Sequence, residues 1–392
     1  MDEIKKIMAD CKAHGVKVLS PDVNESQMHF SVNAEGNVRF GFKGIKTFGE
    51  NVAAAIIEER EKKGRFAGLI DFVERMGRTP LGLSRRVIEQ LYSSGAFDSF
   101  GVDRRVFEEL PSDGGDIFLD SLAKYASLIK NDGASDEGMS LFGDVEELKP
   151  QAPAIPEVKG ELEVTKRVEM LHKEKELVGM YLSSHPLDTY DLERQYFAPD
   201  SLEDIPVWID SCHEKKTSRK VRFAVMVTGR ENRTSASGRP WMIYEVEDKT
   251  GVYSGKLFSK ECEKFQPLLV VGNFLYLEGM IEQPRRPGAE ESYDDVKHEF
   301  RIKEVALLGT LCDTKVKEFV LELDAAKVSS DEMTQVYKVL RKHKGKTPVV
   351  LDLVDFARKY QVQLRARKTS VTVSTRLVQD LQDLGIKATL KV

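Results

Sequence analysis

The segment from Lys43 to Ile56, KGIKTFGENVAAAI, constrains the fold more than any other part of this chain. A short loop, Ile45-Lys46-Thr47-Phe48, runs into Gly49, and small residues follow at positions 52–55. Glycine favours a tight turn and alanine favours helix, so the segment predicts a bend followed directly by a helix. The first backbone N–H groups of such a helix have no partners within the helix, and they suit a phosphate.

This pattern is close to a helix-hairpin-helix, a motif in which a tight turn between two short helices exposes backbone donors. Such donors cannot read bases, so the loop would hold duplex nucleic acid without regard to sequence. A second, looser copy follows at residues 96–101, and it predicts another helix that begins with two arginines. Two copies predict a tandem clamp on a DNA backbone. The candidate duplex-binding residues are Lys43, Gly44, Lys46, Thr47, Gly49, Ser99, Gly101, Arg104 and Arg105.

Three residues depart from the usual hairpin. Thr47 and Ser99 stand where a glycine is expected, and Glu50 opens the first helix. A carboxylate at that position suits the helix dipole but competes with a phosphate. The alternative interpretation is an ordinary helical turn, capped at Gly49 or Gly101.

Composition bounds the class of protein. A chain of 392 residues is long enough for two to four domains. It has no apolar run of membrane-spanning length and no signal peptide at its start, so we expect a cytoplasmic location and no membrane partner. The four cysteines form no CxxC pair, which argues against a zinc ribbon or a disulfide framework. They are Cys11, Cys212, Cys262 and Cys312.

Charge is segregated along the chain, although the net charge is only -5. Residues 113–163 are acidic, whereas residues 215–239 and the segment after Lys315 are rich in Lys and Arg. This arrangement is typical of a local nucleic-acid groove with a separate acidic linker.

Within residues 35–110, the apolar spacing predicts helices near 50–62, 83–94 and 102–110. Further helices are predicted at 117–130, inside a linker over 111–164, and at 165–182, in a helical connector over 165–214.

Residues 215–310 change to the alternating pattern of strands. Five short strands with intervening turns predict a small β-barrel of OB type. Basic residues gather on the first strand and its loop, and two aromatic residues lie on faces opposite the expected core. Such groups make a single-strand site, in which cations follow phosphates and aromatic rings stack on bases. The alternative is a solvated charged rim. The candidates are Arg219, Lys220, Arg222, Arg230, Arg233, Arg239, Trp241, Lys256 and Phe258.

The last segment, 311–392, predicts a small α+β domain of strands and two helices. Ser329 to Glu332 forms a capping box for the first helix, and Ser374 is expected to cap the second. Asp352 and Asp355 come nearest to a carboxylate pair, but we interpret them as a strand-to-helix junction. No catalytic residue and no metal site are predicted anywhere in the chain. The overall fold class is therefore multidomain α+β, built from binding modules.

Several stretches together resemble the bacterial DNA polymerase III alpha subunit, the replicative polymerase of the C family, in its C-terminal part. They are GVKVLSPDVNES at 15–26, VRFGFKGIKTFGENVAAAIIEER at 38–60, LYSSGAFDSFG at 91–101, SLFGD at 140–144, HKEKELVGMYLSSHPL at 172–187 and EDKTG at 247–251. The resemblance implies that residues 1–34 close a fingers domain. It also implies that 35–110 grip duplex and that 215–310 handle single-stranded template. The catalytic carboxylates, with their Mg²⁺, would then lie outside this chain, so no cofactor is expected in it.

The resemblance also implies protein partners. Met139, Ser140, Leu141 and Phe142 resemble a sliding-clamp-binding peptide, although Gly138 stands where a Gln is usual. Local packing of this apolar patch is the alternative. The last domain resembles one that contacts the clamp-loader tau subunit in some members. The rival hypothesis for the whole chain is a non-enzymatic adaptor of DNA repair or recombination that reuses hairpin and OB modules.

Overall fold

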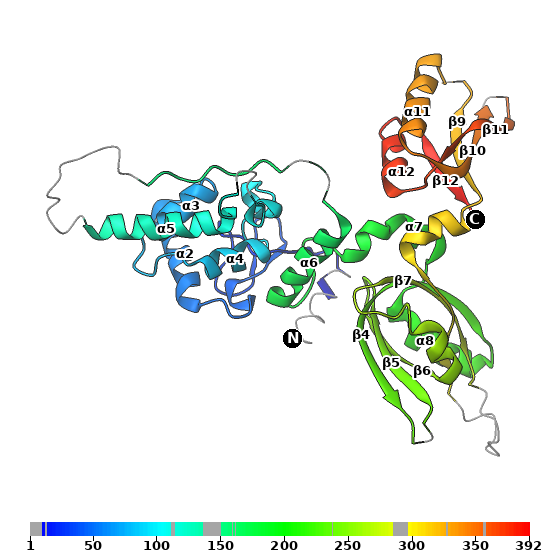
Figure 1. The fold of residues 1–392 in the computed structure, drawn as a ribbon, viewed down its shortest axis with the longest axis horizontal. Coiled ribbons are helices and arrows are strands. Elements are labelled where there is room, and N and C mark those ends of the chain that lie inside the picture. The colour runs from blue at the N-terminus through cyan, green and yellow to red at the C-terminus, as the bar shows by residue number, and fades with distance from the viewer. Residues whose placement is uncertain are drawn as a thin grey trace. The chain divides into compact units, whose positions relative to one another are not determined.

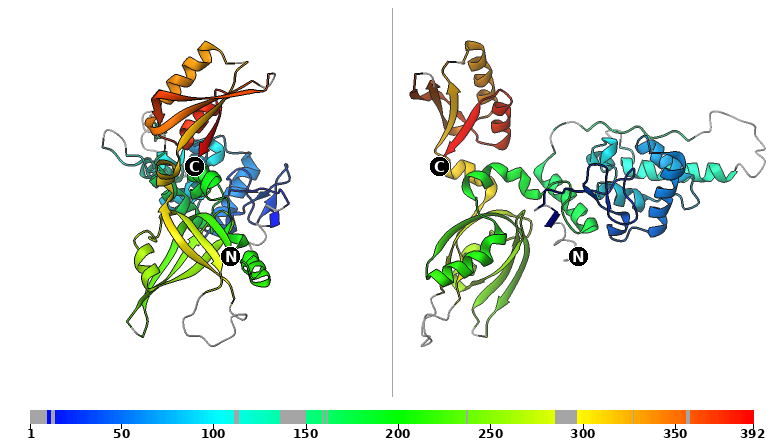
Figure 2. Two further views of the ribbon diagram at one scale, coloured as in Figure 1. Left: turned by 90° about the vertical axis from the view of Figure 1, so that its right-hand side faces the viewer. Right: turned by 180° about the vertical axis from the view of Figure 1, so that it is seen from behind.

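The computed structural model describes residues 10–11, 14–110, 114–135, 150–158, 160, 162–236, 238–284, 297–326, 328–355 and 358–392. The chain forms two compact units, Met1–Pro186 and Leu187–Val392, called here the N-terminal and C-terminal units. Helices dominate the first, and two larger sheets with flanking helices form the second (Figures 1 and 2). The mixed α+β class is as predicted, while the finer division into six segments stays a prediction. No described helix combines the length and the apolar composition that a membrane crossing requires.

Where the structure describes it, the N-terminal unit is built mainly of five helices. These are α2 (Glu50–Lys63), α3 (Leu69–Gly77), α4 (Arg85–Ser93), α5 (Phe118–Ser135) and α6 (Val164–Val178). The 3₁₀ turn η1 (Phe42–Gly44) precedes α2, and η2 (Asp98–Phe100) and η3 (Arg104–Phe107) lie between α4 and α5. A small sheet has the order β1-β3-β2, with β1 (Val18–Leu19), β2 (Ser31–Val32) and β3 (Val38–Arg39). The predicted helices near 50–62 and 83–94 are confirmed as α2 and α4, and Ser84 accepts the cap hydrogen bond from Val87 N–H.

One aromatic core holds these helices together. The rings of Tyr92 and Phe107 stack with centroids 4.4 Å apart, and Phe97 links Phe107 to Phe72. Each fully buried side chain of this kind contributes about 1.5–3 kcal/mol. Val178, at the end of α6, is 1% exposed and belongs to the same core. Helix α6 is therefore part of this unit.

Two helix predictions need correction in this unit. The helix expected near 102–110 is a single 3₁₀ turn, η3, because Asp103 accepts a hydrogen bond from the Arg105 N–H and a buried ion-pair network holds Arg104. Helix α3 was not predicted, although its buried residues Leu69, Phe72, Val73 and Met76 have helical spacing.

The first sheet of the C-terminal unit is antiparallel, with the order β6-β5-β4-β7-β8. Its strands are β4 (Arg219–Thr234), β5 (Pro240–Glu247), β6 (Val252–Phe258), β7 (Phe274–Glu282) and β8 (Glu299–Leu307). All five match predicted strands. The edge strands β6 and β8 do not pair within the described residues, so the predicted barrel closure is not confirmed. Helices α8 (Ile205–Lys215) and α9 (Ser259–Phe265) share one core with this sheet.

A β-bulge divides β4 into two halves. Odd-numbered residues lie on the core side before the bulge, and even-numbered residues lie on the core side after it. Val227 pairs with Val246 but Gly229 pairs with Glu245, so β4 carries one extra residue between these pairs. Before the bulge, Val221, Phe223 and Val225 face the core. After it, Arg233 pairs with Trp241, on the face opposite the buried Tyr244. Bulges commonly re-aim side chains in this way.

The second sheet has the order β11-β10-β9-β12. Its strands are β9 (Glu318–Asp324), β10 (Lys344–Asp355), β11 (Tyr360–Val371) and β12 (Lys387–Lys391), and it packs with α11 (Ser330–Lys342) and α12 (Thr375–Gln382). The predicted capping box at Ser329 and the Ser374 cap are confirmed. The remaining elements of the unit are η5 (Pro186–Tyr190), α7 (Asp191–Phe197), η6 (Leu202–Asp204), η8 (Leu308–Thr310) and α10 (Leu311–Lys315).

The expected strand-to-helix junction at Asp352 and Asp355 is wrong. Strand β10 runs through both residues and pairs with β11, Asp355 opposite Tyr360. Asp352 accepts hydrogen bonds from the Gln361 side chain. The pair therefore belongs to a β-hairpin.

A buried carboxyl lies where α7 meets α10. Glu193 is 8% exposed; its Oε1 accepts a hydrogen bond from Cys312 Sγ at 3.5 Å, and its Oε2 has no partner among the described residues. Burial raises the pKa of Glu193. The native state thus keeps a proton that the unfolded chain loses above its own pKa of about 4.3. Stability is lost as pH rises from there through the native pKa.

We expect Glu193→Gln to raise the free energy of unfolding at pH 7.5, because the amide carries no charge to desolvate. Near pH 4 the difference from the parent chain should shrink. Urea unfolding followed by tryptophan fluorescence measures this, since Trp208 and Trp241 both lie in the C-terminal unit. The exposed Glu203→Gln is the matched control. Equal shifts in both variants would contradict the prediction.

Candidate nucleic-acid interface

The first bend adopts a left-handed turn at a residue that is not glycine. Thr47 has φ +58°, a conformation that costs an L-residue roughly 1–2 kcal/mol. The buried Gln90 of α4 compensates: its Nε2 donates to Thr47 O at 3.2 Å and to Thr47 Oγ1 at 3.0 Å. The threonine hydroxyl therefore takes part in holding the bend, which a glycine at this position could not do.

Beyond this bend the N-terminus of α2 is open. Gly49, the N-cap, is extended at φ −71° and ψ 126° and supplies no side-chain cap. Among the described residues, the backbone N–H groups of Gly49, Glu50 and Asn51 have no hydrogen-bond acceptor. Lys46 and Glu50 are exposed, and Lys43 Nζ lies 3.1 Å from Glu50 Oε1. The bend therefore presents free donors and lysines on its outer side, with one competing carboxylate.

The second bend is not a geometric copy of the first. Ser99 lies within the 3₁₀ turn η2, and the left-handed residue is Gly101, at φ +69°. In the Thr47-Phe48-Gly49 triplet the left-handed residue comes first, whereas in Ser99-Phe100-Gly101 it comes last. No α-helix opens directly after it. Ser99 and Gly101 are exposed.

The Arg104 side chain is mostly buried and forms ion pairs within the fold. Its guanidinium binds Asp98 through Nε at 2.8 Å and Glu174 through NH1 at 2.7 Å. Glu174, on α6, has a fully buried side chain and also accepts the backbone N–H groups of Leu182 and Ser183. Arg104 has its charge matched by two carboxylates, so its predicted contact with DNA stays untested. We assign it a structural role.

Helix α6 contacts the first bend directly and reaches the second through Arg104, which also binds Asp98 of that bend. The Leu177 carbonyl accepts the Lys46 N–H at 2.8 Å, and Glu174, about one turn earlier, binds Arg104. Arg105 pairs with Asp103 and donates to the Gly160 carbonyl. The structure thus links the two bends through Arg104 and a helix that was predicted to be a connector.

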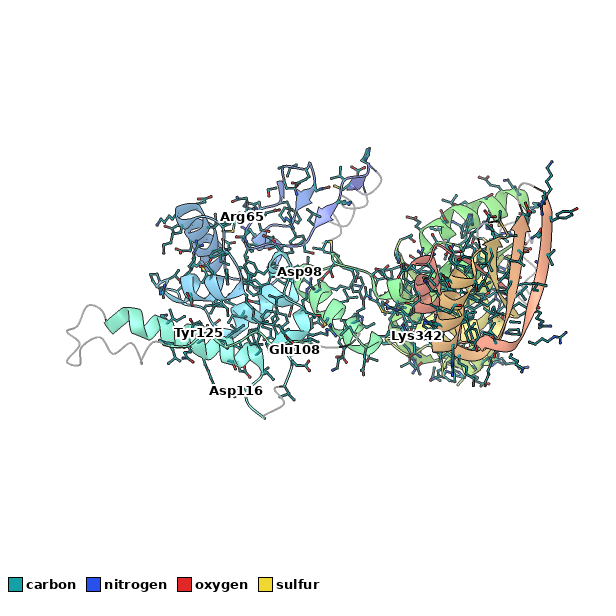
Figure 3. The ribbon with its side chains drawn as sticks, turned by 90° about the horizontal axis from the view of Figure 1, so that it is seen from above. Arg65, Asp98, Glu108, Asp116, Tyr125 and Lys342 are labelled. Atoms are coloured by element: carbon teal, nitrogen blue, oxygen red, sulfur yellow. The ribbon has the colours of Figure 1, made fainter. Side chains whose placement is uncertain are left out.

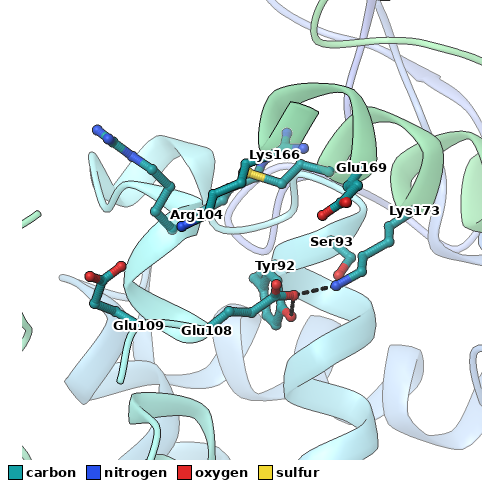
Figure 4. Close-up of a pocket in the computed structure, with 10 residues that line it drawn as sticks. Tyr92, Ser93, Arg104, Glu108, Glu109, Lys166, Glu169 and Lys173 are labelled. Carbon is teal, nitrogen blue, oxygen red and sulfur yellow. Dashed lines mark hydrogen bonds and ion pairs between the residues drawn. The ribbon is translucent and has the colours of Figure 1, made fainter. Parts of the chain in front are cut away.

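A cavity of about 150 Å³ lies between η3, α4 and α6. Figure 4 shows Tyr92 and Lys173 directed at the Glu108 carboxylate, which accepts from both, at 2.7 and 2.5 Å. Lysines and glutamates line it in similar numbers. Because its charges are mixed and partly paired with one another, it does not form a phosphate site.

We expect Gln90→Leu to loosen the first bend, because Thr47 would lose both hydrogen bonds that support its strained conformation. Loss of these bonds should lower the free energy of unfolding of the N-terminal unit by about 1–3 kcal/mol. Thr47→Gly in the Gln90→Leu background should recover part of it, since glycine adopts positive φ without strain. Thermal unfolding by circular dichroism tests both variants, and no recovery would contradict the role assigned to Thr47.

The single-strand candidates separate into two groups. Arg233, Trp241 and Phe258 are direct cross-strand neighbours on the outer face of β4, β5 and β6. The Arg233 guanidinium lies 5.3 Å from the Trp241 ring, and the Trp241 and Phe258 rings stack at 5.9 Å. Phe258 is 54% exposed, and Lys256 is exposed on the same face. Trp241 therefore belongs to an outer aromatic row and not to the core.

The other candidates lie elsewhere on β4 or in the turn that follows it, and three of them have local partners. Arg219 covers the Trp208 ring at 4.2 Å, and Lys220 pairs with Glu278. Arg230 donates to the Gln266 and Leu269 carbonyls. Arg222 is partly buried, and Arg239 is exposed in the β4–β5 turn.

Two residues that shape the interface were missed in the sequence. Gln90 has no local signature. Glu174 has one: it falls between Leu171 and Val178 on the buried face of α6, where a charge implies a buried partner. The candidate clamp peptide, Met139 to Phe142, lies outside the described residues.

Comparison with known proteins supports the helix-hairpin-helix prediction. A family model described as a helix-hairpin-helix motif matches residues 15–107, which include both bends. DNA polymerase III subunit alpha of Saccharopolyspora erythraea is 29% identical over 90% of this chain, and that of Deinococcus radiodurans is 28% identical over 90%. The Escherichia coli K12 subunit is 27% identical over 98%.

The predicted resemblance to the DNA polymerase III alpha subunit is confirmed. The chain spans only 28%, 24% and 31% of the length of these three alpha subunits. The chain is therefore similar to only a part of each of these alpha subunits. Among the described residues, no group of three or more His, Cys, Asp or Glu side chains could hold a metal ion.

Proposed function

We propose that this chain is a DNA-binding and partner-docking segment of a replicative polymerase of the C family, with the chemistry of nucleotide transfer performed outside it. The observation that carries the proposal is the open N-terminus of α2 behind the Thr47 bend. Its free N–H groups and the positive end of the helix dipole suit a backbone phosphate. Lys43 and Lys46 would add sequence-independent attraction to duplex DNA.

We further propose that single-stranded template crosses the outer face of β5 and β6. A strand order of β6-β5-β4-β7-β8, with α9 between the third and fourth strands, supports an OB-type domain, a fold that is often only partly closed. Bases would stack on Trp241 and Phe258, while Arg233 and Lys256 would lie near phosphates. Each stacked base would contribute about 1–3 kcal/mol.

The partners follow from the family resemblance. We propose that residues 139–142 dock the sliding clamp and that the C-terminal domain is a candidate contact for the clamp-loader tau subunit. A cytoplasmic location and Mg²⁺-dependent polymerisation by the complete alpha subunit complete the proposal. These partners rest on sequence motifs, whereas the DNA contacts also rest on geometry.

A pair of substitutions at Glu50 tests the duplex site. Glu50→Pro removes one backbone N–H at the first position of α2, where proline fits the helix, and the extended Gly49 suits a following proline. Glu50→Ala removes the same carboxylate but keeps the N–H. We expect Glu50→Ala to bind a labelled duplex more tightly than the parent, because Lys43 is freed.

Glu50→Pro should bind that duplex roughly tenfold more weakly than Glu50→Ala, the value of one hydrogen bond to a charged group. Circular dichroism should show the same helix content in both variants. Equal affinities would remove the backbone phosphate site. A full chain with no salt-dependent duplex binding would refute the proposed function as a whole.

A further inference from the structure

The C-terminal domain carries positive charge that the interface described above does not use. Residues 311–392 contain sixteen Lys and Arg against ten Asp and Glu, whereas the whole chain has a net charge of -5. Two stretches without any acid account for most of it, KVLRKHKGK at 338–346 and RKYQVQLRARK at 358–368. Charge of one sign in two separate stretches suggests that the fold gathers it for a ligand.

The fold joins parts of both stretches at one end of the second sheet. Helix α11 ends at Lys342, labelled in Figure 3, and β10 begins at Lys344. The His343 carbonyl accepts the Thr372 N–H at 2.8 Å, and the Gly345 carbonyl accepts Ser370 Oγ at 2.7 Å. These contacts bring the start of β10 to the end of β11.

An irregularity in β11 adds two more cations. Pro348 pairs with Ser370, but Val350 pairs with Arg365, so β11 carries extra residues that include Arg367 and Lys368. Both are exposed. They lie beside the β10 segment that directly follows Lys346. The basic cluster so formed consists of Lys338, Arg341, Lys344, Lys346, Arg367 and Lys368.

The charges of the basic cluster are not neutralised by described acidic side chains. None of its six cations forms an ion pair with another described residue, and all six are exposed. At the opposite edge, Lys387 and Lys391 on β12 pair with Glu322 and Glu318. Nearby Lys342 and Arg376 are both bound to Asp380. Apart from Lys317, which donates to the Val392 carbonyl, and Lys359 near the tip of the β10–β11 hairpin, the described cations of this domain that lack an ion pair all lie in the cluster.

We propose that the basic cluster binds the phosphate backbone of single-stranded nucleic acid. Exposed lysines and arginines in a row neutralise phosphates, and each contact releases counterions. Tyr337, 54% exposed, lies one turn before Arg341 and offers a ring on which a base can stack. The inference rests on the proposed function, since it extends nucleic-acid binding to a second domain of this chain.

An acidic protein partner fits this surface less well. Protein interfaces need buried apolar contacts at their centre. The exposed apolar residues Tyr360, Val362 and Leu364 lie toward the other end of the β10–β11 hairpin, and no apolar side chain is part of the cluster. A ligand that binds through its phosphates and through base stacking suits the cluster better.

The test uses the full chain and a fluorescently labelled oligo(dT), titrated at several salt concentrations. One variant replaces Lys344, Lys346, Arg367 and Lys368 by alanine. Its matched control replaces Lys317, Arg358, Lys387 and Lys391, four cations of the same domain that already have partners. We expect the cluster variant to bind roughly tenfold more weakly, with a salt slope smaller by about 2–3. The control should bind within about twofold of the parent chain.

Three outcomes would overturn the proposal. Equal losses in both variants would show a general effect of charge, and no loss in either would leave the cluster without a ligand. Displacement of oligo(dT) from the cluster by poly-glutamate as effectively as by unlabelled oligo(dT) would favour an acidic protein instead. If the parent chain bound no DNA of any kind, the proposed function would fail, which is distinguishable from these results.

Discussion

Replacing Glu174 by alanine is expected to lower the free energy of unfolding of the N-terminal unit by about 3–5 kcal/mol, the cost of breaking a buried ion pair from one side. Arg104, whose side chain is only 12% exposed, would keep Asp98 alone as its partner. The backbone N–H groups of Leu182 and Ser183 would lose their common acceptor. Both bends should loosen, because α6 holds them.

The two tryptophans distinguish a loss of stability in the N-terminal unit from a loss of stability in the whole chain. Both lie in the C-terminal unit, so their fluorescence should keep its unfolding midpoint in the Glu174→Ala variant. Circular dichroism, which also reports the helices of the N-terminal unit, should show an earlier transition. Glu176→Ala, an exposed change on the same helix, should stay within about 0.5 kcal/mol of the parent. A Glu174→Ala chain as stable as this control would show that the ion pair between Glu174 and Arg104 does not stabilise the N-terminal unit.

Loss of the outer aromatic row should have the largest effect on single-strand binding. Trp241→Ala and Phe258→Ala should each weaken oligo(dT) binding by about 1–3 kcal/mol, and the double variant should bind by charge alone. Its salt slope should remain near that of the parent, because Arg233 and Lys256 are kept. This behaviour distinguishes stacking from phosphate contacts.

A matched aromatic change checks the specificity of that result. Tyr360→Ala removes a ring that is 67% exposed on a different sheet, and it should leave oligo(dT) affinity unchanged. Quenching of tryptophan fluorescence by oligo(dT) should also disappear in Trp241→Phe while the affinity falls only modestly. Persistence of the full quench would place the bases elsewhere.

The sequence predicted the helices and strands whose formation depends on neighbouring residues in the chain. Helix α2 follows from Gly49, the alanines and Gly64, and the alternation of Met242, Tyr244 and Val246 fixes one face of β5. The helix expected near 102–110 failed because tertiary contacts override propensity there: Arg104 reaches Glu174, seventy residues away in the chain. Nothing near Arg104 in the sequence signals that partner.

The candidate site was predictable only in part for the same reason. The Thr47 bend was located, but the left-handed φ at a threonine depends on Gln90, forty-three residues away. Trp241 and Phe258 were expected opposite the core, and the structure places them there. The similarity of residues 96–101 to the first bend did not extend to backbone geometry, because Gly101 and not Ser99 takes the positive φ.

The single extra residue between Val227 and Gly229 has a consequence for how this chain tolerates insertion and deletion. Deleting it would remove the bulge but leave Gly229 opposite Glu245 and Arg233 opposite Trp241, so both faces of the strand would keep their residues. Deleting a residue from a regularly paired stretch of β4 would instead turn its neighbours to the other face, because side chains alternate along a strand. A change in length of one residue should therefore be tolerated better at this position than in either regular half of the strand.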